Sequence, residues 1–101
     1  MALLQQILYK VKIISVAGTH ANEVNDLQID SRKVKPGNCF IAVKGTLADG
    51  HSFIDTAITN GAAAIICEVL PATLNDNIQY IVVENSASAA GIMAHNFYGQ
   101  L

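Results

Sequence analysis

Charged residues are scarce in this sequence, and neither sign is concentrated in one part of it. Asp, Glu, Lys and Arg make up 14% of the 101 residues, and the formal net charge is −2. A domain that binds nucleic acid through its phosphates carries a basic face, whereas the six Lys and Arg residues here are scattered. The local basic cluster of Arg32, Lys33 and Lys35 suits one or two phosphates rather than a duplex. Nucleic acid is therefore not expected as a partner.

Cysteine is also scarce: the chain has two, Cys39 and Cys67, and each lies inside an apolar run. Buried free thiols are expected at such positions, because a disulfide or a metal site requires more partners or a closer spacing. A reactive thiol is the alternative, but neither cysteine has a His or a basic neighbour in sequence to lower its pKa. Free thiols favour a reducing compartment, so the cytoplasm is the expected location.

Long apolar runs are absent as well. The first sixteen residues contain apolar stretches, but Gln5, Gln6, Lys10 and Lys12 interrupt them, so no signal peptide is expected. No segment approaches the ~20 apolar residues that a membrane-spanning helix needs. We therefore expect a soluble chain with no membrane partner.

The common signatures of catalysis are missing too. The sequence has no Gly-x-Gly-x-x-Gly and no Gly-Lys-Ser/Thr loop, which argues against a nucleoside-triphosphate site of that kind. His20, His51 and His95 lack the i, i+4 spacing of a metal site. Ser31 is not in a nucleophile elbow, and no two carboxylates are paired for acid–base work. We expect no catalytic residue and no metal site in this chain, which favours a binding module.

What the sequence does contain is a series of short apolar segments separated by turns. Apolar residues at helical spacing predict a helix over 2–9, and β-branched residues predict a strand over 12–16. The polar stretch 19–25 is expected to be a loop, and the alternation over 27–30 predicts a strand with one buried face. Further strands are expected at 39–43, 63–67 and 81–83. Between them, Phe53, Ile54, Ala57 and Ile58 predict a helix face that ends at Asn60-Gly61, and Asn85 or Ser86 is expected to cap a final helix.

This order of elements predicts an α/β fold, with one domain over residues 1–101 and a small mixed β-sheet with flanking helices. The strands at 39–43 and 63–67 enclose a helix, so they are expected to be parallel and joined by a right-handed crossover. Loops at strand ends gather at one edge of such a sheet, where ligands usually bind. Polar side chains that could hold a ligand lie at these ends: Asp30, Ser31, Arg32, Thr46, Asp49 and His51.

The combined pattern of turns and strands resembles a known family. It consists of Asp-Ser-Arg at 30–32, Lys-Pro-Gly at 35–37, Phe-Ile-Ala-Val-Lys-Gly at 40–45, Ala-Asp-Gly-His-Ser-Phe at 48–53 and Gly-Ala-Ala-Ala-Ile at 61–65. In order and spacing these segments closely resemble the N-terminal domain of the Mur ligases, and the likeness covers about residues 25–101. It is far more specific than a single glycine motif.

The resemblance implies a binding role for this domain. In the family, the N-terminal domain holds the uridine diphosphate part of the substrate, UDP-N-acetylmuramoyl-dipeptide. By position, Ile29 and Ser31 would touch the nucleotide, whereas Arg32 would touch it or instead fix Asp30. A loop beside the uracil would be formed by Thr46, Leu47, Ala48 and Asp49.

The resemblance also implies what the whole enzyme does. It would be an ATP- and magnesium-dependent ligase of peptidoglycan synthesis that adds a diamino acid, meso-diaminopimelate or L-lysine, to UDP-N-acetylmuramoyl-L-alanyl-D-glutamate. The family's central ATPase and C-terminal domains are absent from this chain, which is expected to be monomeric, without a cofactor of its own, and inactive alone. The alternatives are the family members that add D-alanyl-D-alanine, or a stand-alone nucleotide-binding module.

Overall fold

In the computed structural model, which describes residues 2–21, 23–45 and 48–99, the main sheet has five strands in the order β2-β7-β6-β5-β4. These strands are β2 (Ile13–Gly18), β4 (Leu27–Gln28), β5 (Cys39–Ile41), β6 (Ala64–Cys67) and β7 (Gln79–Val83). Neighbouring strands from β4 to β7 are parallel, and β2 is antiparallel to β7. The expected mixed sheet is therefore confirmed, including the parallel pairing of β5 with β6.

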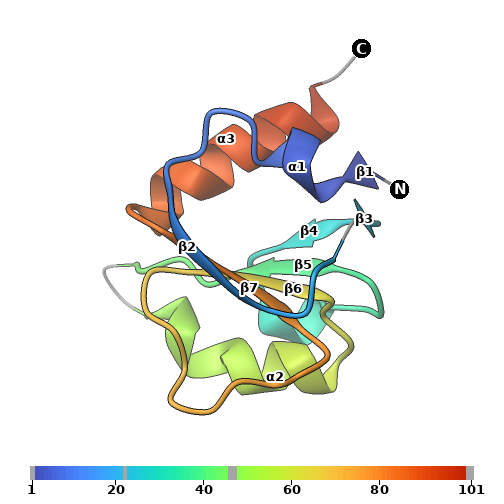
Figure 1. Ribbon diagram of the computed structural model, residues 1–101, viewed down its shortest axis with the longest axis vertical. Coiled ribbons are helices and arrows are strands. Elements are labelled where there is room, and N and C mark those ends of the chain that lie inside the picture. The colour runs from blue at the N-terminus through green and yellow to red at the C-terminus, as the bar shows by residue number, and fades with distance from the viewer. Residues whose placement is uncertain (1, 22, 46–47, 100–101) are drawn as a thin grey trace.

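Helices cover both faces of this sheet (Figure 1). On one face lie α1 (Leu4–Ile7) and α3 (Ser86–Tyr98), and on the other lies α2 (Ile54–Thr59). Two short 3₁₀ helices, η1 (Ser31–Lys33) and η2 (Gly50–Phe53), both contact α2. A separate two-stranded sheet pairs β1 (Ala2–Leu3) with β3 (Glu23–Val24). The architecture is thus three layers, helix on sheet on helix.

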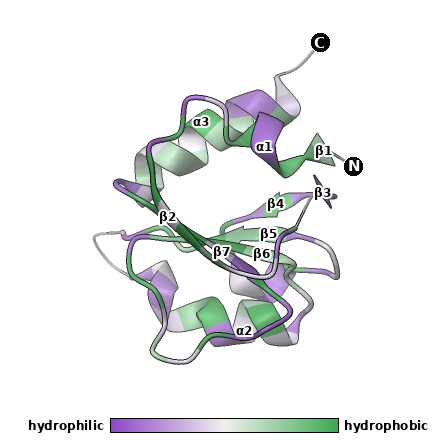
Figure 2. Cartoon of the chain, viewed as in Figure 1, coloured by the Kyte–Doolittle hydropathy of each residue, from purple (hydrophilic) through white to green (hydrophobic). Residues whose placement is uncertain are grey.

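The central strands are buried on both faces, as parallel strands between two helical layers must be. Successive residues alternate between the two cores: Cys39, Ile41 and Ile66 pack toward α1 and α3, whereas Phe40 and Ile65 pack toward α2. In Figure 2 these strands are predominantly hydrophobic, while hydrophilic residues lie on the helices and loops around them. This is why the apolar runs of the sequence identified the strands so well.

Several predicted boundaries are confirmed by the hydrogen bonds that set them. The Asn85 side chain accepts from the Ser88 N–H and so caps α3. Asn60 is the C-cap of α2, and Gly61 follows with φ of +108°. The strand predicted at 81–83 is also present, but β7 begins two residues earlier, at Gln79.

The N-terminal segments differ from their predictions. The helix expected over 2–9 is limited to Leu4–Ile7, because Ala2 and Leu3 pair instead with Val24 and Glu23. The segment 19–25 was predicted as a loop, yet it supplies that partner strand. A two-stranded pairing between segments twenty residues apart leaves no periodic signal in either one, so sequence periodicity could not detect it.

Two apolar side chains predicted to be buried are exposed instead, and both matter for the site. The strand expected over 27–30 ends at Gln28, because the Asp30 carboxylate caps η1 and turns the chain; Ile29 is 66% exposed. Phe53 belongs to η2 rather than to the face of α2, and it is 46% exposed. The buried face of α2 begins one residue later, with Ile54 and Ala57.

Candidate functional site

The carboxyl ends of the parallel strands bring polar residues to one edge of the sheet. Asp30 and Ser31 follow β4, Lys44 follows β5, Glu68 follows β6 and Ser86 follows β7. Ligands in open α/β sheets bind at this edge, because the loops there can vary without disturbing the strands. Two of the hollows among the described residues at this edge include predicted site residues, one beside η1 and one beside Lys44.

The first hollow has a volume of about 590 Å³ and is open to solvent. It lies between η1 and the start of α2, and it is lined by Ile29, Asp30, Ser31, Arg32, Phe53 and Thr56. Single exposed apolar side chains are ordinary on a protein surface, but here two large ones, Ile29 and Phe53, line the same concavity. An apolar hollow with a few polar groups at its rim suits a flat, partly polar ring.

Local hydrogen bonds fix the wall of this hollow. The Arg32 backbone N–H and Nε both donate to Asp30 Oδ1, at 3.0 Å each, and Arg32 Nη2 donates to Oδ2 at 2.9 Å. These side-chain bonds, with the backbone bond, lower the pKa of Asp30 to about 2. An ion pair this exposed adds little to global stability. Its effect is to hold the turn after β4, which supports the structural alternative expected for Arg32.

The second hollow, of about 290 Å³, includes Lys44, Asp49, His51 and Glu68 in its lining. Lys44 and Asp49 form an isolated antiparallel bridge, so they close a turn. The Gly45 N–H donates to the Ala48 carbonyl at 3.1 Å, and the Gly50 N–H donates to the Val43 carbonyl at 2.8 Å. The described ends of this turn are thus held together by the backbone.

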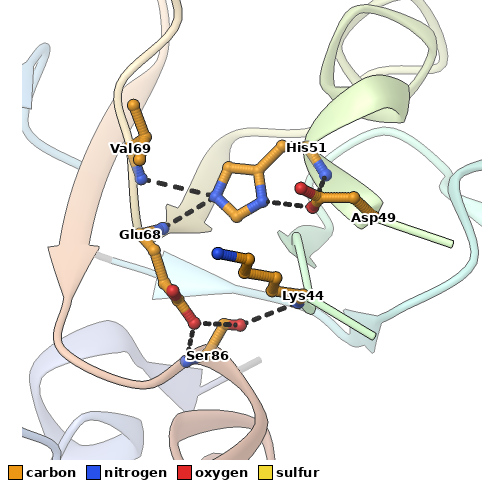
Figure 3. A network of polar contacts seen from close by, with 6 residues as sticks. All are labelled: Lys44, Asp49, His51, Glu68, Val69 and Ser86. Atoms are coloured by element: carbon orange, nitrogen blue, oxygen red, sulfur yellow. Dashed lines mark hydrogen bonds and ion pairs between the residues drawn. The ribbon is translucent and has the colours of Figure 1, made fainter. Parts of the chain in front are cut away.

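His51 ties the end of the turn to the two residues that follow strand β6 (Figure 3). Its Nε2 accepts from the backbone N–H of Glu68 at 2.8 Å and from that of Val69 at 3.4 Å. Because Nε2 is an acceptor, the ring proton is on Nδ1, which donates to Asp49 Oδ1 at 2.7 Å. The same carboxylate oxygen accepts from the His51 backbone N–H at 2.9 Å.

Glu68 and Ser86 tie the start of the turn to helix α3. Ser86 is fully buried, and its N–H and hydroxyl both donate to Glu68 Oε2, at 2.8 and 2.7 Å. The Ser86 Oγ in turn accepts from the Lys44 backbone N–H at 2.9 Å. In Figure 3 the Lys44 side chain points into the space between Glu68 and His51. Its positive charge helps to lower the pKa of both Glu68 and Asp49, after their hydrogen bonds from Ser86 and His51.

These contacts predict an acid-dependent loss of stability at Glu68. The folded-state pKa of Glu68 lies below its ordinary value, chiefly because it accepts from the Ser86 N–H. Its stabilising contribution is therefore complete above the unfolded-state pKa and is lost as the pH falls through the folded-state pKa, from about pH 5 downward. In urea titrations at pH 7 and pH 3, Glu68→Gln should lose less stability than the wild type between the two pH values. An equal loss in both proteins would contradict this assignment.

The predicted nucleotide contacts are distributed over the edge rather than gathered in one hollow. Ile29 and Ser31 lie in the first hollow, although Ser31 is only 6% exposed. Asp49 lies in the second hollow, Ala48 is exposed beside it, and Thr46 and Leu47 lie outside the described residues. The 3₁₀ helix Gly50–Phe53 joins the two hollows. At about 2 Å of rise per residue, it separates them by roughly 8 Å, less than the length of a nucleoside diphosphate sugar.

Phe53 and Thr56 were missed as site residues by sequence reasoning. Phe53 was assigned to the buried face of a helix because the apolar pairs Phe53-Ile54 and Ala57-Ile58 are four residues apart. The available signal was Asp49 as an N-cap: its carboxylate accepts from the His51 N–H and starts a 3₁₀ turn before α2. A 3₁₀ turn has three residues per turn, which rotates Phe53 away from the face that Ile54 and Ala57 bury.

The described residues outside the two hollows include no reactive thiol, no metal-binding cluster and no helix that could span a membrane. Cys39 and Cys67 are buried free thiols, as expected, and burial raises their pKa values to about 12 and about 11. Within residues 2–21, 23–45 and 48–99, no three His, Cys, Asp or Glu side chains are placed to hold a metal ion. Across the same residues, none of the helices has the length and apolar character to cross a membrane.

Both the sequence and the fold have relatives among known proteins. A family model described as Mur ligase family, catalytic domain, matches residues 23–98. The 2,6-diaminopimelate-adding UDP-N-acetylmuramoyl-L-alanyl-D-glutamate ligase of Phocaeicola vulgatus is 40% identical over 96 residues, which are 95% of this chain and 20% of that enzyme. The corresponding ligase of Cytophaga hutchinsonii is 45% identical over 96 residues, 94% of this chain and 20% of that enzyme. The chain thus spans about a fifth of the length of these curated relatives.

Among solved structures, a crystal structure of MurF from Acinetobacter baumannii matches with a TM-score of 0.74 at 23% identity, over 93% of this chain and 20% of that one. MurF from Thermotoga maritima, in complex with ADP, matches with a TM-score of 0.62 at 36% identity, over 75% of this chain and 17% of that one. The likeness to the Acinetobacter structure is a likeness of fold.

Proposed function

The chain belongs to the Mur ligase family, and on that premise we propose that it is the domain that holds the uridine diphosphate end of the substrate in a ligase of peptidoglycan synthesis. The observation that carries the proposal is the 40% and 45% identity to two diaminopimelate-adding ligases over almost the whole chain. The substrate of the whole enzyme is then UDP-N-acetylmuramoyl-L-alanyl-D-glutamate. We further propose a cytoplasmic location and a monomeric state.

The first hollow supports this role by its chemistry. A uracil ring needs apolar contact on its faces and hydrogen-bonding groups at its edge. Ile29 and Phe53 offer the apolar surface, while Ser31 and Thr56 offer polar groups within the same lining. This arrangement differs from the one that the resemblance implies, in which the loop at 46–49 lies beside the uracil. With the uracil in the first hollow, the ribose and diphosphate would extend along η2 toward Ala48 and Asp49.

In the proposed whole enzyme, ATP would convert the D-glutamate carboxylate to an acyl phosphate, and the amine of diaminopimelate would displace the phosphate. No residue of this chain is assigned to that step, since the sequence has no Gly-Lys-Ser/Thr loop. The role of this domain is to grip the end of the substrate far from the reacting carbonyl. Binding energy gained there orients the carboxylate where the chemistry occurs.

The alternative within the family is a ligase that adds D-alanyl-D-alanine, since a solved D-alanyl-D-alanyl ligase from Acinetobacter baumannii shares the fold of this chain. The higher identity and longer coverage of the diaminopimelate-adding ligases favour the first assignment. The gene sequence beyond Leu101 separates a ligase from a stand-alone binding module. A Gly-Lys-Thr loop within the next few tens of residues would support a ligase, and a stop codon would exclude it.

The uridine proposal predicts an effect of Phe53 on binding. Because stacking of a base on an aromatic side chain contributes about 1–3 kcal/mol, Phe53→Ala should weaken binding of UDP-N-acetylmuramoyl-L-alanyl-D-glutamate roughly tenfold. Titration of this chain followed by amide NMR signals measures the change, and shifts are expected at Ser31 and Asp49. Tyr9→Ala is the matched control, since Tyr9 is an exposed aromatic residue outside the hollow. Equal affinities of the two variants would refute the role of Phe53.

A further inference from the structure

We propose that Ser86, Glu68 and His51 are positioning residues that hold the described ends of the turn after β5, Lys44-Gly45 and Ala48-Asp49, in their ligand-binding geometry. The sequence analysis named His51 as a side chain that could hold a ligand, but it gave no role in the site to Glu68 or Ser86. The inference rests on the proposed function, because it concerns the turn that includes Ala48 and Asp49. It connects the turn to Glu68, which directly follows β6, to Ser86 in α3 and to His51 in η2.

The geometry that carries this inference is a closed circuit of hydrogen bonds (Figure 3). The Lys44 N–H donates to Ser86 Oγ, whose hydroxyl donates to Glu68 Oε2. The Glu68 backbone N–H donates to His51 Nε2, and His51 Nδ1 donates to Asp49. The bridge between Asp49 and Lys44 then completes the circuit.

Each link in the circuit joins the turn to a more rigid part of the fold. β6 is buried along its whole length and pairs with strands on both sides. Ser86 is the first residue of α3 and is fully buried. The described residues of the turn that follows β5, Lys44, Gly45, Ala48 and Asp49, are exposed. The circuit therefore holds these four residues by hydrogen bonds rather than by burial.

The Ser86 hydroxyl occupies the central position in this arrangement. It accepts from Lys44 and donates to Glu68 at the same time, and hydrogen bonds in such a chain polarise and strengthen one another. The Glu68 carboxylate also lies at the first turn of α3, where negative charge is favoured. Removing the hydroxyl would leave the Lys44 N–H and one side of the carboxylate without their partner. Lys44 and Gly45 would then sample other conformations, and ligand binding would have to order them again.

Ser86→Ala tests the proposal, with Asn85→Ala as the matched control. Asn85 caps the same helix through Ser88 and makes no link in the circuit, so its loss weakens α3 without releasing the turn. The first measurement needs no ligand: hydrogen exchange at the amides of Lys44 and Gly45 should be at least roughly tenfold faster in Ser86→Ala than in Asn85→Ala. Equal exchange in the two variants would overturn the positioning role. If Ser86→Ala does not fold, His51→Ala breaks the circuit on the opposite side and takes its place.

The second measurement is affinity for UDP-N-acetylmuramoyl-L-alanyl-D-glutamate, followed by NMR titration. Binding should weaken roughly five- to tenfold in Ser86→Ala and stay within about twofold of wild type in Asn85→Ala. Faster exchange with unchanged affinity would show a structural circuit only and overturn its link to the ligand. A wild-type chain that binds no UDP-substrate would instead refute the proposed function, while the exchange result would still decide whether the circuit holds the turn.

Discussion

Replacing Phe40 by alanine is expected to destabilise the domain by about 3–5 kcal/mol, a large part of the total stability of a domain of this size. Phe40 lies in β5 between two other strands and is 0% exposed. It packs in the core that faces α2, with Ile65 and Tyr80 among its neighbours in that cluster. The truncation removes its buried area and leaves a cavity that three fixed strands cannot close. Urea denaturation followed by circular dichroism measures the loss.

Phe53→Ala is the matched control for this prediction, because it deletes the same atoms from a side chain that is 46% exposed. Its cost to stability should be below about 1 kcal/mol. Phe40→Ala is thus expected to lower the free energy of unfolding, whereas Phe53→Ala is expected to lower the affinity for the nucleotide. Similar losses of stability in the two proteins would show that Phe53 belongs to the core and not to the site.

Replacing Gly61 by alanine is the second change with a large expected effect, a loss of about 2–5 kcal/mol. Gly61 has φ of +108°, a conformation that side chains of L-residues rarely adopt. A Cβ there would lie 2.7 Å from Pro36 Cα, so backbone would have to move. The same turn is tied to the one before β5, because the Gly37 N–H donates to the Gly61 carbonyl at 3.0 Å. Thermal or urea unfolding would measure the loss.

Gly91→Ala provides the control of opposite sign. Gly91 lies inside α3, and a Cβ built on it meets no atom within 4 Å. Alanine there is expected to stabilise the protein by about 0.5–1 kcal/mol, because it favours the helix and restricts the unfolded chain. If both glycine variants lost stability to the same extent, the close approach of Gly61 to Pro36 would not be the cause.

Most of the fold was predictable from sequence because its strongest signals are local. The buried strands β5, β6 and β7 are continuous apolar runs, and parallel strands between two helical layers require such runs. Asn85 and Asn60-Gly61 predicted helix ends correctly, since capping depends on bonds between residues three or four positions apart. The pairing of β1 with β3 could not be predicted, because two-residue strands carry no periodic pattern.

The candidate site also has features that local sequence predicts and features that depend on long-range contacts. The sequence by itself determined the α/β class, the family and which polar residues lie at the ends of the strands. These follow from the order of the apolar segments, their spacing and the turn residues between them, all of which can be read along the chain. Only the tertiary structure decided that Ile29 and Phe53 share one hollow, and that Ser86 and Glu68 hold the start of the turn at Lys44. Lys44 and Ser86, which are joined by a hydrogen bond, lie 42 positions apart in the sequence. They lie close together because the carboxyl ends of four parallel strands are at the same edge of the sheet. Which strands are neighbours depends on the strand order, and no local sequence pattern contains that order.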